Sequence, residues 1–237
     1  MRTRFQHGLD ELREKLLRMG GLAEQAVDRA RQAYVERDLT RCQMVLEGEG
    51  LINTVEREID EAAFDLLAMQ QPMAVDLRFI LAVTKINSDL ERVGDQAVNI
   101  AERVMDMTEL PAVELPVDIA RMGSAVSAMV RRSLESFIEA KVELAQAVLE
   151  MDSVIDRMRD DAFIQLVKTM NERPEVVRQA LDALLVARNL ERVADHATNI
   201  AEDVIFWVQG ADVRHNVGVE PTESSDPTRR TPRVSGL

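Results

Sequence analysis

The sequence predicts an all-α protein built from two related halves. Of its 237 residues, 46% are hydrophobic and 30% are charged, whereas only 3% are aromatic. Ala, Leu, Val, Met, Glu and Arg dominate, and this composition favours packed amphipathic helices over sheets. The segment ERVGDQAVNIAE, which begins at Glu91, returns one hundred residues later as ERVADHATNIAE. The composition therefore indicates the fold class, and the repeat indicates a duplicated unit.

The prolines divide the chain into helices. Pro111 and Pro116 mark a short linker between the halves, and Pro72 and Pro174 each stand at the expected start of a helix. Each half then predicts three helices, at residues 9–36, 40–69 and 73–107 and at 118–150, 151–170 and 174–209. The expected architecture is two tandem three-helix bundles, with the first repeat at 1–110 and the second at 115–210.

Glycines and the end of the chain complete this outline. Gly20 and Gly21 interrupt the first helix and are interpreted as a kink or as tolerated glycines, each costing about 1 kcal/mol. Gly210 is expected to end the last helix. The segment 211–237 is rich in Ser, Thr and Pro and is predicted to be disordered.

Charge and cysteine content exclude several classes of function. The formal net charge of −13 disfavours nucleic acid as a partner and favours cations or basic protein surfaces. Cys42 is the only cysteine, so an internal disulfide and a thiolate metal site are excluded, and a reduced, cytosolic setting is expected. No run of 18 apolar residues occurs, so direct membrane insertion is not expected.

The repeated helix carries two kinds of matched position. Residues 86–104 and 186–204 share 11 identities in 19 positions. The apolar matches fall on one stripe and are explained by core packing. The polar matches lie opposite that stripe, within about one quarter of the helix circumference. They are Glu91, Asp95, Asn99 and Glu102 in the first half, and Glu191, Asp195, Asn199 and Glu202 in the second.

These polar rows allow two interpretations. A face opposite the core is normally solvated, and two acids one turn apart can simply lie on it. However, the polar residues match across the duplication while apolar neighbours differ, as with Gly94 and Ala194. Like charges at this spacing also repel by about 0.2–0.5 kcal/mol, which a bound cation would offset.

The helix before each repeat supplies a second acidic row. Glu49, Asn53, Glu56 and Asp60 share one face in the first half, and Asp152 and Asp156 do so in the second. Antiparallel neighbours could bring the two rows together. Several carboxylates with few imidazoles and no thiolates suit iron, manganese, magnesium or calcium, and zinc is also compatible. The pattern thus predicts a cation site in each half.

At these residues the chain resembles the PhoU family of phosphate-uptake and phosphate-signalling regulators. The resemblance rests on FQHGLDELREKLLRMGGLAEQAV near the start, on the segment Ile52–Asp60, on QQPMAVDLR at Gln70–Arg78, on both repeated helices, and on FWVQGADVRH at Phe206–His215. It implies a duplicated pair of three-helix bundles, often dimeric, that binds multinuclear metal clusters through paired (E/D)xxxD motifs. Glu91 with Asp95, Glu191 with Asp195, and Asp152 with Asp156 match that motif.

Some positions depart from the motif or only accompany it. The first-half partner pair reads Glu49 and Asn53, where a longer acid replaces the family's aspartate and the second position has no charge. Further residues on the same faces are implied as accessory ligands, namely Asn99, Asn199, Glu102 and Glu202. The implied metals are iron, zinc, manganese or magnesium.

The resemblance also implies partners. They are the ATPase subunit of the phosphate ABC transporter and a membrane sensor histidine kinase, contacted in the cytoplasm by a non-enzymatic negative regulator that forms homodimers. Two rival readings remain open: a plain helical scaffold whose acidic faces bind basic partners, and a di-iron carboxylate oxidase. The oxidase class needs Glu-x-x-His pairs, which this sequence lacks. His196 lies off the acidic row and is expected at an interface or on the surface.

Overall fold

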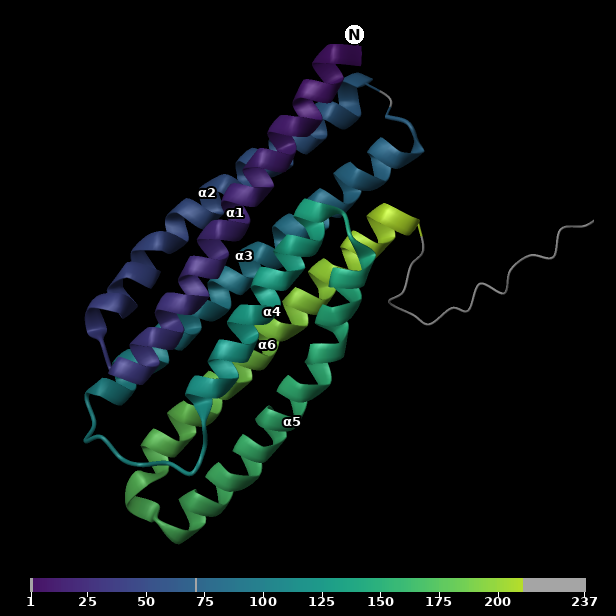
Figure 1. Cartoon of the computed structure of the whole chain (residues 1–237). Helices are drawn as coiled ribbons and strands as arrows, with labels where there is room; N and C mark the ends of the chain where they lie inside the picture. The colour runs from purple at the N-terminus through teal and green to yellow at the C-terminus, as the bar shows by residue number, and fades with distance from the viewer. Residues whose placement is uncertain (1, 71, 211–237) are drawn as a thin grey trace, which may run out of the picture.

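The computed structural model describes residues 2–70 and 72–210, and this part of the chain is helical without any strand (Figure 1). The fold class predicted from composition, an all-α protein of two tandem three-helix bundles, is confirmed. The helices are α1 (Arg2–Glu36), α2 (Leu39–Gln70), α3 (Ala74–Thr108), α4 (Ile119–Glu139), α5 (Val142–Glu172) and α6 (Val177–Gln209), with a 3-10 turn η1 (Pro174–Val176) before the last.

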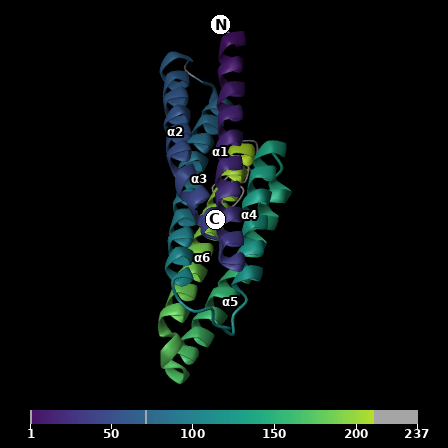
Figure 2. The same cartoon turned by 90° about the vertical axis from the view of Figure 1, so that its left-hand side faces the viewer.

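The two repeated helices, α3 and α6, form the centre of the molecule. They pack side by side in opposite directions, with α1 and α2 against α3 and with α4 and α5 against α6 (Figures 1 and 2). Two polar pairs join them: Asp89 accepts from His196 Nδ1 at 2.8 Å, and Nζ of the exposed Lys85 lies 3.4 Å from the buried Asp203. His196 is therefore an interface residue, as the sequence predicts.

The apolar stripes of the repeat pack into this centre. Leu90, Val93, Ala97, Ile100 and Val104 are all buried, and so are their counterparts one hundred residues later. Because α1 also contacts α4, the core of one half continues into the core of the other. The two bundles consequently share a single hydrophobic core rather than two separate ones.

An aromatic cluster closes one end of the shared core. Phe79 of α3, Phe137 of α4 and Trp207 of α6 contact one another, with ring centroids 5.2–6.0 Å apart. The guanidinium carbon of Arg13, on α1, lies 5.3–6.0 Å from all three centroids. This cluster joins four helices drawn from both halves.

The predicted boundary between the fourth and fifth helices is wrong. The sequence suggested one helix to Glu150 and the next from Met151, but α4 ends at Glu139 and α5 begins at Val142. Ala140 adopts a left-handed conformation with φ 51°, which costs roughly 1–2 kcal/mol for a residue with a Cβ. The N–H of Lys141 bonds to the carbonyl of Ser136 at 3.1 Å and caps α4. No glycine or proline lies at this break to indicate it in the sequence.

Gly20 and Gly21 do not interrupt α1, so of the two predicted alternatives the tolerated glycine applies and the kink does not. The helix continues through both, and a Cβ on Gly20 would lie 2.6 Å from the Leu134 side chain of α4. Gly20 therefore permits close contact between the halves, whereas Gly21 faces open space. Gly210 ends α6 as predicted, with φ 73° and its N–H bonded to the carbonyl of Phe206.

The remaining boundaries differ only in detail. The first helix begins at Arg2, seven residues before the predicted start, and the proline-bounded linker joins α3 to α4. The predicted disordered tail, residues 211–237, lies outside the described residues, and the domain limits at 110 and 115 stay a prediction. None of the helices described is both long and apolar enough to cross a membrane.

Candidate metal centre and its two carboxylate faces

The acidic rows meet on the surface of each half, between the second and third helix of each bundle. We call the first set the first-half face, made of Glu49, Asn53, Glu56 and Asp60 on α2 with Glu91 and Asp95 on α3. The second-half face is made of Asp152, Asp156 and Arg159 on α5 with Glu191 and Asp195 on α6. Most of these side chains are half-buried, so the two helices of each pair partly shield them from water.

Carboxylates of the first-half face affect one another's protonation. Burial, followed by the charges of Asp60 and Asp95, raises the pKa of Glu56. Burial, followed by Asp95 and Glu56, raises the pKa of Glu91, and a hydrogen bond between the Glu91 and Asp95 side chains adds to the shift. The sequence prediction that acids from α2 and α3 come together is therefore realised at Glu56, Glu91 and Asp95.

Two asparagines border the first-half face. Asn87 is fully buried, and its Nδ2 donates to the backbone carbonyl of Glu56 at 3.0 Å and to Asp60 Oδ1 at 3.1 Å. Asn53 Oδ1 is buried and has no hydrogen-bond partner in residues 2–70 and 72–210. An uncompensated buried carbonyl oxygen costs about 1–3 kcal/mol, and a cation coordinated by this atom would remove that cost.

The second-half face already contains a cation of its own. Arg159 Nη2 lies 3.6 Å from Asp156 and 3.5 Å from Glu191, and Nη1 lies 2.8 Å from Asp160. Its guanidinium thus bridges α5 and α6. Even so, burial, Asp156 and Glu191 raise the pKa of Asp152. Sequence reasoning missed Arg159 because its position between the rows depends on the packing of the two helices.

Asp195 experiences the largest shift on either face. Asp195 is partly accessible to solvent. Desolvation by the protein around its carboxyl group, followed by the charges of Glu191, Asp152 and Asp156, nevertheless raises its pKa from 3.8 to about 6. The charged form is therefore disfavoured in the folded protein, and any stabilisation from the neutral form is present below pH 3.8 and lost as the pH rises through about 6.

Replacing Asp195 by Asn in protein treated with a chelator is expected to stabilise the fold above pH 6 and to have little effect near pH 4. Because the group is partly solvated, we expect a gain of at most about 1 kcal/mol at low salt, or roughly 2–4 °C in Tm. Thermal unfolding at pH 4 and pH 8 measures this effect. Asp161→Asn, an exposed acid elsewhere on α5, is the matched control. An equal gain at both pH values would contradict the assignment.

The accessory candidates are placed unevenly. Asn99 is half-buried and Glu102 is exposed on α3. Asn199 donates its Nδ2 to Asp89 at 3.2 Å, so this amide joins the two halves rather than the second-half face. Glu202 is half-buried on α6 and has interactions of its own. The paired acids therefore form each face, and Asn199 is not part of the second-half face.

The donor chemistry of the first-half face fits a hard cation, but its side chains do not converge. Nowhere in the described ranges are three or more His, Cys, Asp or Glu side chains placed to hold a metal ion. The oxygens of Glu56, Glu91 and Asp95, with the orphaned Asn53 Oδ1, are nevertheless the ligand types that Mg²⁺, Mn²⁺ and iron accept. Side-chain rotation would have to complete such a site.

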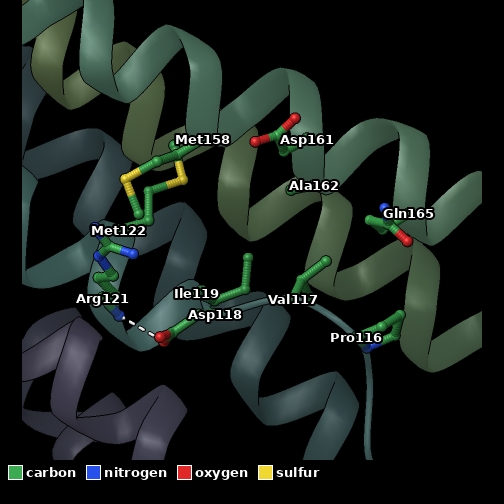
Figure 3. A pocket seen from close by; sticks show the side chains of 10 residues that line it. All are labelled: Pro116, Val117, Asp118, Ile119, Arg121, Met122, Met158, Asp161, Ala162 and Gln165. Carbon is green, nitrogen blue, oxygen red and sulfur yellow. Dashed lines mark hydrogen bonds between the residues drawn. The ribbon is translucent and has the colours of Figure 1, made fainter.

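A surface pocket of about 180 Å³ lies between the linker and α5, and none of the residues of the two acidic faces lines it (Figure 3). Met122 and Met158 lie together at one end of it, and Asp118 caps α4 by accepting from the Arg121 N–H at 2.9 Å. The lining offers no pair of acid and base side chains suited to catalysis.

Together, the shared core and the duplicated acidic faces define a class of protein: a tandem three-helix-bundle protein whose distinguishing surface is anionic. The sequence model of the PhoU domain matches residues 16–104 and 119–204, which cover both halves. The chain belongs to the PhoU family.

Sequence and structure matches to individual relatives cover most of the chain. A phosphate-specific transport system accessory protein PhoU homolog from Pseudomonas aeruginosa is 40% identical over 214 residues, 89% of this chain and 88% of the relative. The crystal structure of PhoU from the same organism has a TM-score of 0.83 at 38% identity, covering 87% of this chain and 100% of that one. A phosphate transport system regulatory protein PhoU from Streptococcus pneumoniae has a TM-score of 0.81 at 26% identity, covering 88% and 99%.

Proposed function

We propose that this protein is a non-enzymatic accessory regulator of a phosphate-specific transport system. The observation that carries the proposal is the family match over both halves of the chain. Relatives that match over 88–99% of their own length are named as accessory or regulatory proteins of phosphate transport. The expected outcome of its action is repression of phosphate uptake and of the phosphate-starvation response.

The proposed action takes place through contacts with other proteins. By the family relationship, the partners are the ATPase subunit of the phosphate transporter and a sensor histidine kinase, both reached from the cytoplasm, and the regulator acts as a homodimer. The net charge of −13 supports protein partners with basic surfaces. The exposed carboxylate faces are the regions where such surfaces would be attracted most strongly.

We further propose that the carboxylate faces hold metal ions. Glu56, Glu91, Asp95 and Asn53 would hold a cation in the first half, and Asp152, Asp156, Glu191 and Asp195 in the second. A bound cation would neutralise the face and cross-link the two helices that carry it. Burial, followed by the charges of neighbouring carboxylates, raises the pKa values of Glu56, Glu91 and Asp195, and a bound cation would offset both effects.

The regulatory proposal is tested in a strain that lacks its own PhoU protein. Expression of this chain is expected to restore repression of a phosphate-starvation reporter in phosphate-rich medium. Copurification from the same cells should recover the transporter ATPase and the kinase. Failure of a well-expressed chain both to repress the reporter and to retain either partner would overturn the proposal.

A metal-free scaffold is the second candidate, and one observation favours it: no metal-binding group is preformed in the part of the chain that the structure describes. A scaffold binds cations weakly and loses them as salt rises, whereas coordinated ions survive added salt. Equilibrium dialysis with Mn²⁺ at low and high NaCl separates the two. Retention of stoichiometric metal at high salt supports coordination, and its loss supports the scaffold.

A further inference from the structure

An exposed apolar patch continues the first-half face toward the loop between α2 and α3. On α3, Leu77 and Leu81 share the helix face of Glu91 and Asp95, and their exposed fractions are 37% and 39%. Phe64, one turn beyond Asp60 on α2, is 72% exposed. The surface therefore passes from apolar to acidic along the helix pair.

The second half has the same arrangement of an apolar patch beside an acidic face. Val177 and Leu181 of α6 stand one hundred residues after Leu77 and Leu81, and their exposed fractions are 39% and 45%. On α5, Phe163 and Val167 continue the row of Asp156 toward the loop and are 52% and 37% exposed. Large apolar side chains thus lie in the same place beside both acidic faces, although burial in the core would favour them elsewhere.

The second-half face shows how a guanidinium fits between the helices. Arg159 contacts carboxylates of both α5 and α6 there. Counted from the matched positions Asn53 and Asp156, the residue in the same register of the first half is Glu56. The first half thus has an additional carboxylate where the second half has its own cation. An external cationic side chain would find unneutralised charge mainly in the first half.

We propose that the first-half face and its apolar patch form a docking surface for a helical segment of a protein partner. That segment carries large apolar side chains at one end and arginines about three turns further on. Leu81 and Glu91 are ten residues apart, or about 15 Å along the helix, which sets the spacing. This inference rests on the proposed function, and it deepens it by specifying the chemistry of the regulated partner.

Charge distinguishes this occupant from two others. An anionic lipid surface would be repelled by the acidic half of the face, and a second copy of the chain would bring a like-charged face against it. A basic amphipathic helix matches both parts, because its apolar end covers Phe64, Leu77 and Leu81 while its arginines neutralise Glu56, Glu91 and Asp95. The second half, where Arg159 already offsets part of the negative charge, is the weaker docking surface.

The test uses synthetic helical peptides and the full-length protein treated with a chelator, because a bound metal ion would compete with the arginines for Glu56, Glu91 and Asp95. One peptide carries two leucines near one end and two arginines about 15 Å further along the helix. A second peptide keeps the arginines and replaces the leucines by alanine. Each peptide is made in two versions, one with the leucine positions near its N-terminus and one with them near its C-terminus. Titration calorimetry is expected to show about one amphipathic peptide bound per chain, at least about tenfold more tightly than the leucine-free peptide.

Variants of the protein locate the docking surface. Glu56→Arg is expected to lower the affinity at least about tenfold, whereas Glu47→Arg, the same charge change on another face of α2, should leave it nearly unchanged. The Phe64→Ser, Leu81→Ser double variant should lose a similar factor, with Met44→Ser as its control. Arg159→Glu should raise the binding from about one to two peptides per chain. Circular dichroism confirms that each variant is folded.

Two results would overturn the docking surface. One is equal weakening by Glu56→Arg and Glu47→Arg, which would indicate general charge attraction; the other is equal binding of the peptides with and without leucine. These results are independent of the reporter assay. Specific peptide binding without repression would refute the regulatory function alone, and repression without specific peptide binding would refute the docking surface alone.

Discussion

Replacing Phe137 by alanine is expected to destabilise the protein by about 3–5 kcal/mol, the usual cost of removing a fully buried aromatic side chain. Phe137 has no exposed surface, and it contacts Phe79 and Trp207 where α3, α4 and α6 meet. The substitution would leave a cavity and would also remove the contact between the Arg13 guanidinium and the Phe137 ring. For a chain of this length we expect Tm to fall by roughly 6–20 °C.

Urea and thermal unfolding measure this loss. Phe163→Ala is the matched control, because the same truncation at a side chain that is 52% exposed should cost under about 1 kcal/mol. A similar small cost for Phe137→Ala would show that the aromatic cluster does not hold the halves together. A separate early transition in that variant would show that the halves unfold independently.

The Glu91→Gln, Asp95→Asn double variant is expected to lower the affinity of the first-half face for divalent metal at least about 100-fold. Loss of an outer-shell residue alone typically costs 10–100-fold, and these carboxylates are proposed as direct ligands. The amides keep the size of the side chains while removing two charges. Both residues are half-buried, and the double variant would leave only Glu56 and Asn53 of the four proposed ligands.

Elemental analysis of chelator-free protein and titration with Mn²⁺ measure the metal content. Glu47→Gln, an exposed acid on another face of α2, controls for the loss of charge. The second-half face should keep its own metal in the double variant. Unchanged metal content in the double variant would refute the first-half site, and absence of metal from the unaltered protein would favour the metal-free scaffold.

Much of the fold could be predicted because the spacing of apolar residues along the sequence indicates the helices and their buried faces. The stripe from Leu90 to Val104 is buried as expected, and the linker and the Gly210 cap lie where proline and glycine indicated. The break at Ala140 could not be predicted. A capping bond from the Lys141 N–H to the Ser136 carbonyl accompanies its left-handed conformation, and neither alanine nor lysine is a residue type that indicates such a helix end.

The candidate site was only partly predictable for a related reason. Spacing on one helix places Glu91 and Asp95 on one face, but it does not show which residues of the neighbouring helix lie opposite. Glu56 was in the predicted row without a family match, and Arg159 was not anticipated at all. Only the packing of α5 on α6 shows that Arg159 lies between Asp156 and Glu191.

The central pairing of α3 with α6 also bears on how such a chain could arise. A single three-helix ancestor would have paired this helix with an identical copy, and every contact would then have occurred twice. After fusion, each position could change alone: Asp89 now meets His196, while the counterpart positions hold Asn189 and Gln96. The two halves therefore differ at this contact, and two copies of either half would not reproduce the bond between Asp89 and His196.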